Sequence, residues 1–233
     1  MNYYERLNKL KAWLDETRDT KLEAMDAFFD RRIETYEDHM SPWRNHYKWM
    51  AEVLPECTKK LLDVGCGTGL ELDEIFKRFP SLSVTCVDMS KEMLRVLAEK
   101  HGHRDITIIR GDYFIEELGS GYDTAVAFET LHHFSKERKT RLFRRLRDAL
   151  ADGGVFIECD YIAETPEIED LLFSECRRRR ERDGIAPDTF IHFDTPLTQE
   201  HEMEALRGAG FSRVELVGYL NNDSGTAMIR AYK

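Results

Sequence analysis

A glycine-rich segment carries the clearest chemical signal in the sequence. In LLDVGCGTGL, residues 61–70, Asp63 stands two positions before Gly65, and Gly67 and Gly69 follow at alternate positions. Glycines at this spacing let the backbone turn sharply with positive φ and come close to a bound ligand. The free N–H groups at the start of a following helix would face the same cleft. The segment therefore predicts a binding site for a small polar molecule.

Further acidic residues stand where later apolar runs end. Asp88 closes one run nineteen positions after Gly69, where a carboxylate can accept hydrogen bonds from a ribose diol. Asp112, Glu129 and Asp160 stand at the ends of three more. A dinucleotide site has the spacing G-x-G-x-x-G, which places a pyrophosphate on a helix N-terminus. The spacing here is G-x-G-x-G led by an acid, which suits a ligand end that bears an ammonium group.

The elements that must position these residues alternate between strands and helices after Pro55. Short apolar runs predict strands over residues 59–65, 82–88, 106–110, 122–128 and 154–160. Amphipathic stretches predict helices over residues 70–78, 91–100, 136–150, 165–182 and 199–208. This alternation predicts a largely parallel sheet with helices on both faces. Ligands bind such a sheet beyond the carboxyl ends of its strands, so the acidic residues should meet there.

The two ends of the chain depart from this alternation. Residues 211–220 and 225–232 are strand-like, and Asn-Asn-Asp-Ser at 221–224 joins them, which predicts an antiparallel hairpin. Residues 3–54 look helical with no strand-like run, and Ser41 is expected to cap a helix that starts at Pro42. We expect residues 1–55 to form a helical cap over the glycine-turn cleft. Residues 56–233 would form the ligand-binding domain, with a lid-like insertion at about 162–197.

The composition narrows the class of protein. The chain has 233 residues, 42% of them hydrophobic and 33% charged, which are values of a globular protein. A net charge of -10 argues against a broad nucleic-acid surface, which needs clustered Lys and Arg. Five scattered cysteines without CxxC spacing argue against a disulfide framework or a zinc knuckle. The charged N-terminal residues do not form a signal peptide and no apolar run is long enough for a membrane span, so we expect a cytoplasmic protein.

Five stretches together resemble the class I S-adenosylmethionine-dependent methyltransferases over about 170 residues. The stretches are LLDVGCGTGLEL, VTCVDMSKEML, GDYF, YDTAVAFETLHHF and LRDALADGGVFIECDY, closed by AGFSRVEL and the final hairpin. The resemblance implies a Rossmann-like, doubly wound sheet of seven strands, mostly parallel with a C-terminal antiparallel hairpin. It is similar to the small-molecule type, and the ending HFDTPLTQEHEMEALRGAGF resembles free-standing bacterial members of unassigned substrate.

The resemblance implies roles around the cofactor S-adenosyl-L-methionine, whose product is S-adenosyl-L-homocysteine. Four residues would line the methionine end: Asp63, Gly65, Cys66 and Gly67. Asp88 would hold the ribose hydroxyls, and Met89 would pack on the adenine. Asp112 would bond the adenine amino group with Tyr113 beside it, and Glu129 would sit by the transferable methyl group. Simpler roles compete with these, namely a tight turn for the glycines, a helix N-cap for Asp88 and a turn acid for Asp112.

The acceptor side is expected near the ends of the fourth and fifth strands. His132 and His133 are hypotheses for a general base, because histidine titrates near neutral pH; each competes with a role in packing. Acceptor or lid contacts are predicted for five residues: Tyr36, Trp43, Asp160, Tyr161 and His192. No metal site is predicted, although Glu129, His132 and Asp160 form the set weighed for a divalent ion.

The sequence thus predicts a methyltransferase that acts on a small-molecule acceptor, as a monomer or homodimer. One alternative is a tRNA- or RNA-modifying enzyme that uses S-adenosylmethionine or its carboxylated form. Another is a non-catalytic module that binds the cofactor. The N6-adenine signature, Asn or Asp followed by Pro-Pro-Tyr, is absent after the fourth strand, which argues against DNA-base methylation.

Overall fold

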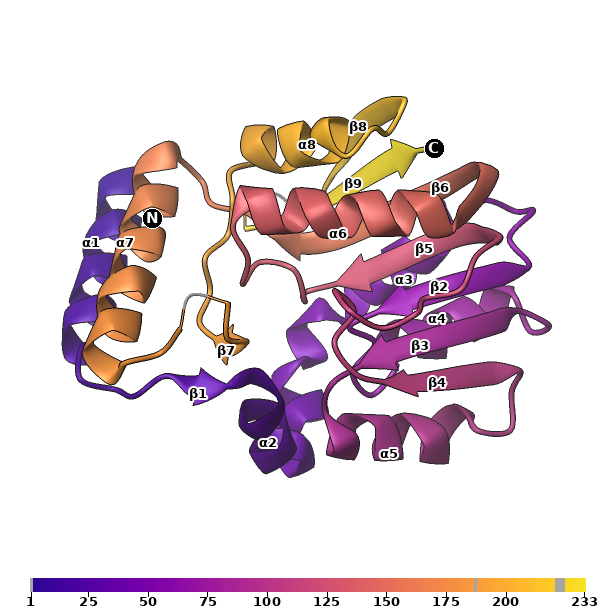
Figure 1. Cartoon of the computed structure of the whole chain (residues 1–233), viewed down its shortest axis with the longest axis horizontal. Helices are drawn as coiled ribbons and strands as arrows, with labels where there is room; N and C mark the ends of the chain where they lie inside the picture. Colours follow the sequence, from indigo (N-terminus) through magenta and orange to yellow (C-terminus); the bar gives the residue numbers. More distant parts are fainter. Residues whose placement is uncertain (1, 187, 221–224) are drawn as a thin grey trace.

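A seven-stranded sheet forms the centre of the computed structural model, which describes residues 2–186, 188–220 and 225–233. The strand order is β4-β3-β2-β5-β6-β9-β8 (Figure 1). The strands are β2 (Lys60–Val64), β3 (Ser83–Asp88), β4 (Ile106–Arg110), β5 (Tyr122–Phe128), β6 (Leu150–Tyr161), β8 (Arg213–Tyr219) and β9 (Thr226–Tyr232). The first five run parallel, and β9 is antiparallel to both β6 and β8. The predicted sheet is confirmed; the predicted turn at 221–224 lies outside the described residues.

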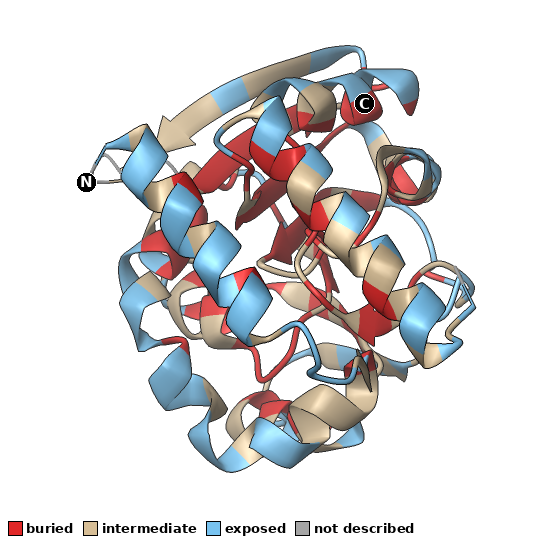
Figure 2. Cartoon of the chain, turned by 90° about the vertical axis from the view of Figure 1, so that its left-hand side faces the viewer, coloured by how far each residue is buried: buried red, intermediate tan, exposed pale blue. Residues whose placement is uncertain are grey.

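Amphipathic helices cover both faces of this sheet. They are α4 (Leu70–Arg78), α5 (Lys91–His101), α6 (Lys136–Ala149) and α8 (Gln199–Gly208). Hydroxyl side chains cap three of them at the N-terminus, as Ser90 does for α5 by accepting from the Met93 N–H at 3.1 Å. Each of these helices buries apolar side chains, such as Leu72 and Ile75 on α4, and Figure 2 shows the buried strands in the interior of the molecule. Their apolar stripes therefore supply the core on each side of the sheet.

Each face of the sheet has its own apolar core. One core joins α6 and α8 to the sheet through buried side chains such as Phe143, Leu206 and Phe156. The other includes Met50 and Leu72 and packs against the opposite face. Strands buried on both faces are near-continuous apolar runs, which is why the sequence located them. β6 begins at Leu150, earlier than predicted, because Leu150 already pairs with Tyr122 on β5.

The N-terminal part differs from the prediction in two details. It contains α1 (Tyr3–Glu16), β1 (Glu23–Ala24), α2 (Met25–His39), the 3-10 helix η1 (Ser41–Trp43) and α3 (Arg44–Val53). The prediction of no strand here is wrong, since β1 pairs antiparallel with β7 (Ile191–His192). The expected Ser41 cap is also wrong. Met40 already has helical dihedral angles, so Ser41 is the first residue of η1 and makes no capping bond.

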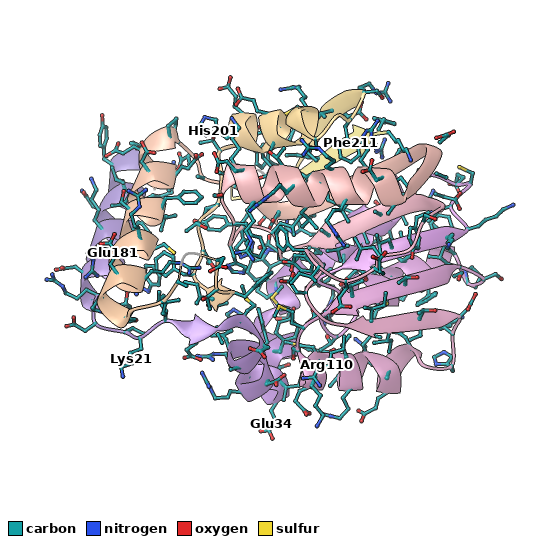
Figure 3. All side chains as sticks on the ribbon, in the orientation of Figure 1. Lys21, Glu34, Arg110, Glu181, His201 and Phe211 are labelled. Atoms are coloured by element: carbon teal, nitrogen blue, oxygen red, sulfur yellow. The ribbon has the colours of Figure 1, made fainter. Side chains whose placement is uncertain are left out.

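The N-terminal helices dock at three different places. α1 lies beside α7 (Pro166–Asp183), and the two share the buried side chains of Leu7, Leu14 and Leu172 (Figure 1). α3 packs on α4, and α2 packs on α5. Figure 1 shows α2, β1 and β7 beyond the ends toward which the arrows of β2 to β5 point. In Figure 3, Glu34 on α2 and Lys21 before β1 point away from the body of the molecule.

None of the helices in the described ranges combines the length and the apolar character needed to cross a bilayer.

Candidate active site

The glycine turn between β2 and α4 adopts the conformation that its sequence predicts. Gly65, Gly67 and Gly69 have φ values of 70°, 49° and 72°. A Cβ at Gly65 would lie 2.1 Å from the Thr130 hydroxyl oxygen, and one at Gly67 would lie 3.3 Å from the Tyr36 hydroxyl. Glycine is therefore required here both for positive φ and for space. The ring of Tyr36 on α2 lies directly over the turn.

Asp88, at the end of β3, holds the turn from its other side. Its Oδ2 accepts the Gly67 N–H at 3.0 Å, and its Oδ1 accepts the Ser90 N–H at 2.8 Å. Burial raises the pKa of the Asp88 carboxyl, while these backbone donors oppose that shift. The carboxylate thus links the glycine turn to the start of α5.

Two buried carboxyl groups lie beneath the turn. Asp63 is fully buried, and no N–H donor of the described residues reaches either of its oxygens. Its neighbour is the carboxyl of Glu71 on α4. Burial raises the pKa of Asp63 well above its usual value and that of Glu71 to about 7. Buried carboxyl oxygens that lack an N–H donor fit the ammonium-bearing ligand that the sequence predicts.

We expect Glu71→Gln to stabilise the fold more at pH 8 than at pH 5. The folded pKa of Glu71 lies above its ordinary value of 4.5, so burial costs nothing below about pH 4.5 and its full amount above about pH 7. A shift of this size corresponds to roughly 3 kcal/mol. Urea unfolding at both pH values measures the difference. Glu74→Gln, on the same helix but ion-paired with Lys77, is the matched control; an equal response of the two variants would contradict the prediction.

A narrow cavity of about 40 Å³ follows the ends of β3 and β4. Asp88, Met89, Tyr113 and Glu129 line it, together with Phe29 of α2 and other residues. This volume holds about one water molecule, so side chains of α2 must move before a nucleoside can enter. Four other predicted cofactor residues do not line it: Asp63, Gly65, Cys66 and Gly67. Asp112 does not line it either, and its Oδ1 accepts the Phe114 N–H at 2.7 Å, as a turn acid does.

Glu129, directly after β5, has a strained backbone. Its φ of 46° is the one positive value at a non-glycine residue in the described ranges. Its Oε1 accepts the Thr226 hydroxyl at 3.0 Å, and burial raises its pKa to about 8. Such strain persists only where the surrounding structure enforces it, which is common at functional sites. Glu129 lines both the narrow cavity and the larger cavity described next.

A much larger cavity of about 980 Å³ opens between α2 and the ends of β5, β6 and β9. Its walls are largely aromatic and include Phe28, Tyr36, Trp43 and Tyr161. Phe28 stacks on His192 with ring centroids 3.4 Å apart. Among its polar side chains, Glu129, His132, His133, His192 and Asp194 lie close together and form one wall. A cavity with apolar walls and a few convergent polar groups is typical of a small-molecule site.

His132 lies between two carboxylates at this wall. Its Nδ1 is 2.6 Å from Asp160 Oδ1, and its Nε2 is 3.5 Å from Asp194 Oδ1. Burial disfavours its charge, but the two carboxylates outweigh burial and raise the pKa of His132 well above its usual value. Asp160 is buried behind the ring, and its oxygens also accept the N–H groups of Leu131 and Tyr161. Asp160 therefore fixes the orientation of His132.

The neighbouring histidines have the opposite character. Burial lowers the pKa of His133 to about 3 and that of His192 to about 4, so both rings are neutral near pH 7.

Two groups in the described chain are close enough to hold a metal ion: His132 with His133 and Asp194, and Glu129 with His132 and Asp160.

The fold brings most of the predicted site residues together. Seven of them line the large cavity: Tyr36, Trp43, Glu129, His132, His133, Tyr161 and His192. The sequence analysis missed Phe29, Glu71 and Asp194. Phe29 belongs to an apolar stripe that also fits a simple core helix. Asp194 lies two positions after His192, and this pair of polar side chains in the sequence could have indicated that Asp194 belongs to the same site.

Comparison with known proteins agrees with this geometry. A family model described as a methyltransferase domain matches residues 62–156. The carboxy-S-adenosyl-L-methionine synthase of Nautilia profundicola is 24% identical, over 70% of this chain and 74% of that protein. The malonyl-[acyl-carrier protein] O-methyltransferase of Halalkalibacterium halodurans is 35% identical, over 42% of this chain and 38% of that protein.

Solved structures share the architecture. A candidate O-methyltransferase from Nostoc punctiforme superposes with a TM-score of 0.66 at 25% identity, over 83% of this chain and 58% of that one. Human N-acetylserotonin methyltransferase, solved in complex with S-adenosylmethionine, gives 0.62 at 17% identity, over 87% of this chain and 55% of that one. The chain thus spans little more than half the length of these two structures.

Proposed function

We propose that this chain, which belongs to the class I S-adenosylmethionine-dependent methyltransferases, transfers the methyl group to a small-molecule acceptor. The observation that carries the proposal is the large cavity beside the narrow one. Glu129, Phe29 and His133 line both, so an acceptor in the large cavity would lie next to a cofactor in the narrow one. The aromatic walls and the volume of about 980 Å³ suit a molecule of metabolite size.

The residues around the glycine turn fit the cofactor. Asp63, whose two buried oxygens have no N–H donor in the described chain, and the glycine turn, where a Cβ at Gly65 would clash with Thr130, would hold its methionine end. Asp88 would hold the ribose. Met89 and Tyr113 would lie beside the adenine, and Asp112 would lie at the edge of the adenine. The bound cofactor supplies a methyl group on a sulfonium sulfur, which the lone pair of the acceptor displaces. The sulfonium is a good leaving group, so the protein contributes mainly alignment and exclusion of water.

The two adjacent histidines would act on the acceptor. His132, oriented by Asp160, and His133 face the cavity where the reactive atom of the acceptor would lie. We propose that both rings position this atom, and that the neutral ring of His133 accepts its proton when it carries one. Tyr161, His192, Tyr36 and Trp43 would form the walls around the acceptor.

The helical N-terminal part, residues 1–55, and the insertion at about 162–197 would form the lid over this site. α2 contributes Phe29 and Tyr36, and the insertion contributes His192 and Asp194. The β1–β7 pair joins the two parts of the lid through backbone hydrogen bonds. Movement of this joined unit would admit the cofactor and then exclude water.

The test combines binding with transfer. Calorimetry with S-adenosylhomocysteine is expected to show micromolar binding, and a labelled methyl group is expected to enter small hydroxyl, amine or thiol acceptors. Bulk tRNA is the comparison acceptor, since binding to it would weaken with salt. Label in tRNA alone would favour the RNA-modifying alternative. Failure to bind S-adenosylhomocysteine would overturn the cofactor assignment itself.

A further inference from the structure

Three side chains of types that bind metal ions lie close together in the wall of the large cavity. One ring nitrogen each from His132 and His133 and one carboxylate oxygen from Asp194 all lie within 4.8 Å of one another. The histidines follow β5, whereas Asp194 follows β7, about sixty residues later. Methyl transfer by alignment alone does not require this set, because the sulfonium needs no further activation.

The distances within this group fit ligands of one metal ion better than hydrogen-bond partners. Asp194 Oδ1 lies 3.5 Å from His132 Nε2 and 3.4 Å from His133 Nδ1. Protein N–H···O hydrogen bonds are shorter, at about 2.7–3.2 Å. Two ligand atoms that each lie about 2.1 Å from a tetrahedral ion are roughly 3.4 Å apart. Two of the three ligand pairs therefore have nearly the spacing of a tetrahedral site, and the third, between His132 and His133, lies within 4.8 Å.

The surroundings of His132 also match those of a metal ligand. A metal-binding histidine usually donates its second ring N–H to a carboxylate, which fixes the tautomer. His132 Nδ1 lies 2.6 Å from Asp160 Oδ1, and Asp160 Oδ2 accepts the Leu131 N–H at 3.0 Å. His132 Nε2 consequently points toward Asp194. His133 Nδ1 also lies 3.2 Å from the Phe193 carbonyl oxygen, so an ion would compete with that hydrogen bond.

The donor set selects the kind of ion. Two imidazole nitrogens and one carboxylate oxygen suit zinc and similar first-row transition metals, whereas magnesium and calcium prefer oxygen ligands. Three protein ligands leave one position of a tetrahedral ion open. All three residues line the large cavity, so the open position would face the acceptor.

We propose that His132, His133 and Asp194 bind one zinc-type dication whose open position takes the reactive atom of the acceptor. The ion site stands on its own geometry, and only its role toward the acceptor rests on the proposed function. The acceptor class follows as a molecule with a hydroxyl, thiol or nitrogen atom able to ligate such an ion. The histidines would then act on the acceptor through the ion. The proposed ion site differs from the sequence analysis, which predicts no metal site.

The test is titration of the metal-stripped full chain with Zn²⁺ by calorimetry and with Co²⁺ by visible absorption. We expect one tightly bound Zn²⁺ per chain, a tetrahedral-type Co²⁺ spectrum and no comparable binding of Mg²⁺. His133→Ala and Asp194→Asn should each weaken Zn²⁺ binding at least tenfold and change the Co²⁺ spectrum. His39→Ala removes a histidine that lines the same cavity outside the group, and it should bind Zn²⁺ as the wild type does. Absence of Zn²⁺ binding, or unchanged binding in both ligand variants, would overturn the site.

Two further measurements separate the site from the proposed function. Circular dichroism should show that His133→Ala and Asp194→Asn are folded like the wild type, so that a loss of Zn²⁺ binding reports on the ligands. Zn²⁺ binding without any methyl transfer would leave the ion site standing and contradict the proposed function. Transfer that is unaffected by removal of Zn²⁺ with a chelator would contradict the role of the ion toward the acceptor.

Discussion

Asp88→Ala is expected to weaken the binding of S-adenosylhomocysteine by about a hundredfold. Hydrogen bonds to a charged group contribute roughly 1.5–3 kcal/mol each, and about 2.7 kcal/mol corresponds to a factor of one hundred. Asp88 holds the Gly67 N–H of the turn at 3.0 Å and the Ser90 N–H of α5 at 2.8 Å, and it would also hold the ribose. The substitution therefore removes a ligand contact and the support of the turn together. Calorimetric titration of both proteins measures the effect.

A matched variant separates these two losses. Asp88→Asn keeps one side-chain oxygen for a backbone donor but removes the charge, so its affinity should fall between those of the wild type and the alanine variant. Asp112→Ala, at the neighbouring strand end, should weaken binding less, because Asp112 bonds the Phe114 N–H within its own turn and does not line the narrow cavity. Equal affinities of wild type and Asp88→Ala, with both proteins folded by circular dichroism, would refute the ribose assignment.

Asp160→Asn is expected to lower kcat by about 10–100-fold while binding of S-adenosylhomocysteine stays unchanged. Removing the carboxylate that orients a functional histidine typically has an effect of this size. Asp160 Oδ1 lies 2.6 Å from His132 Nδ1, and an asparagine can present an amide N–H there, which favours the wrong ring orientation or tautomer. Asp160 does not line either cavity, so it acts as a positioning residue. Steady-state kinetics with an acceptor found in the transfer screen measures the effect.

The control for this variant lies two residues earlier on the same strand. Glu158 is also fully buried on β6, and burial raises its pKa well above the usual value, which favours its neutral form. Glu158→Gln is therefore nearly isosteric with the native group and should leave kcat close to that of the wild type. If the two variants lost activity equally, the loss would reflect disturbance of β6, and the positioning role of Asp160 would be rejected.

Local patterns explain why the glycine turn and the parallel strands could be predicted. The glycine spacing requires a tight turn wherever it occurs, and Gly65, Gly67 and Gly69 all adopt positive φ. Apolar runs located β2 to β5 within one residue at each end, because strands buried on both faces need nearly continuous apolar sequence. The amphipathic stretch at 91–100 likewise located α5 within one residue, and Ser90 caps that helix.

Tertiary contacts explain where the sequence analysis failed. β1 and β7 have two residues each, which is too short for a periodic pattern, and each strand exists only because the other lies beside it. Glu71 looked like one more polar residue of an amphipathic helix, but the packing of α4 on β2 buries it against Asp63. For Asp112 the sequence could not distinguish two roles, because its position in the motif is the same whether it binds a ligand or accepts the Phe114 N–H within its own turn.

The sequence by itself determined where the parallel strands lie and the glycine turn, and through the family resemblance the class of cofactor. These features depend on interactions between residues that are close in the chain or that share a repeating period. Only the tertiary structure decided that Asp194 meets His132 and His133, and that α2 lies over the turn with Tyr36 above Gly67. Such contacts join segments many residues apart, and their geometry depends on how loops and helices pack, which no local pattern records. The methyl donor could thus be inferred from the sequence, whereas the acceptor site had to be assembled by the fold.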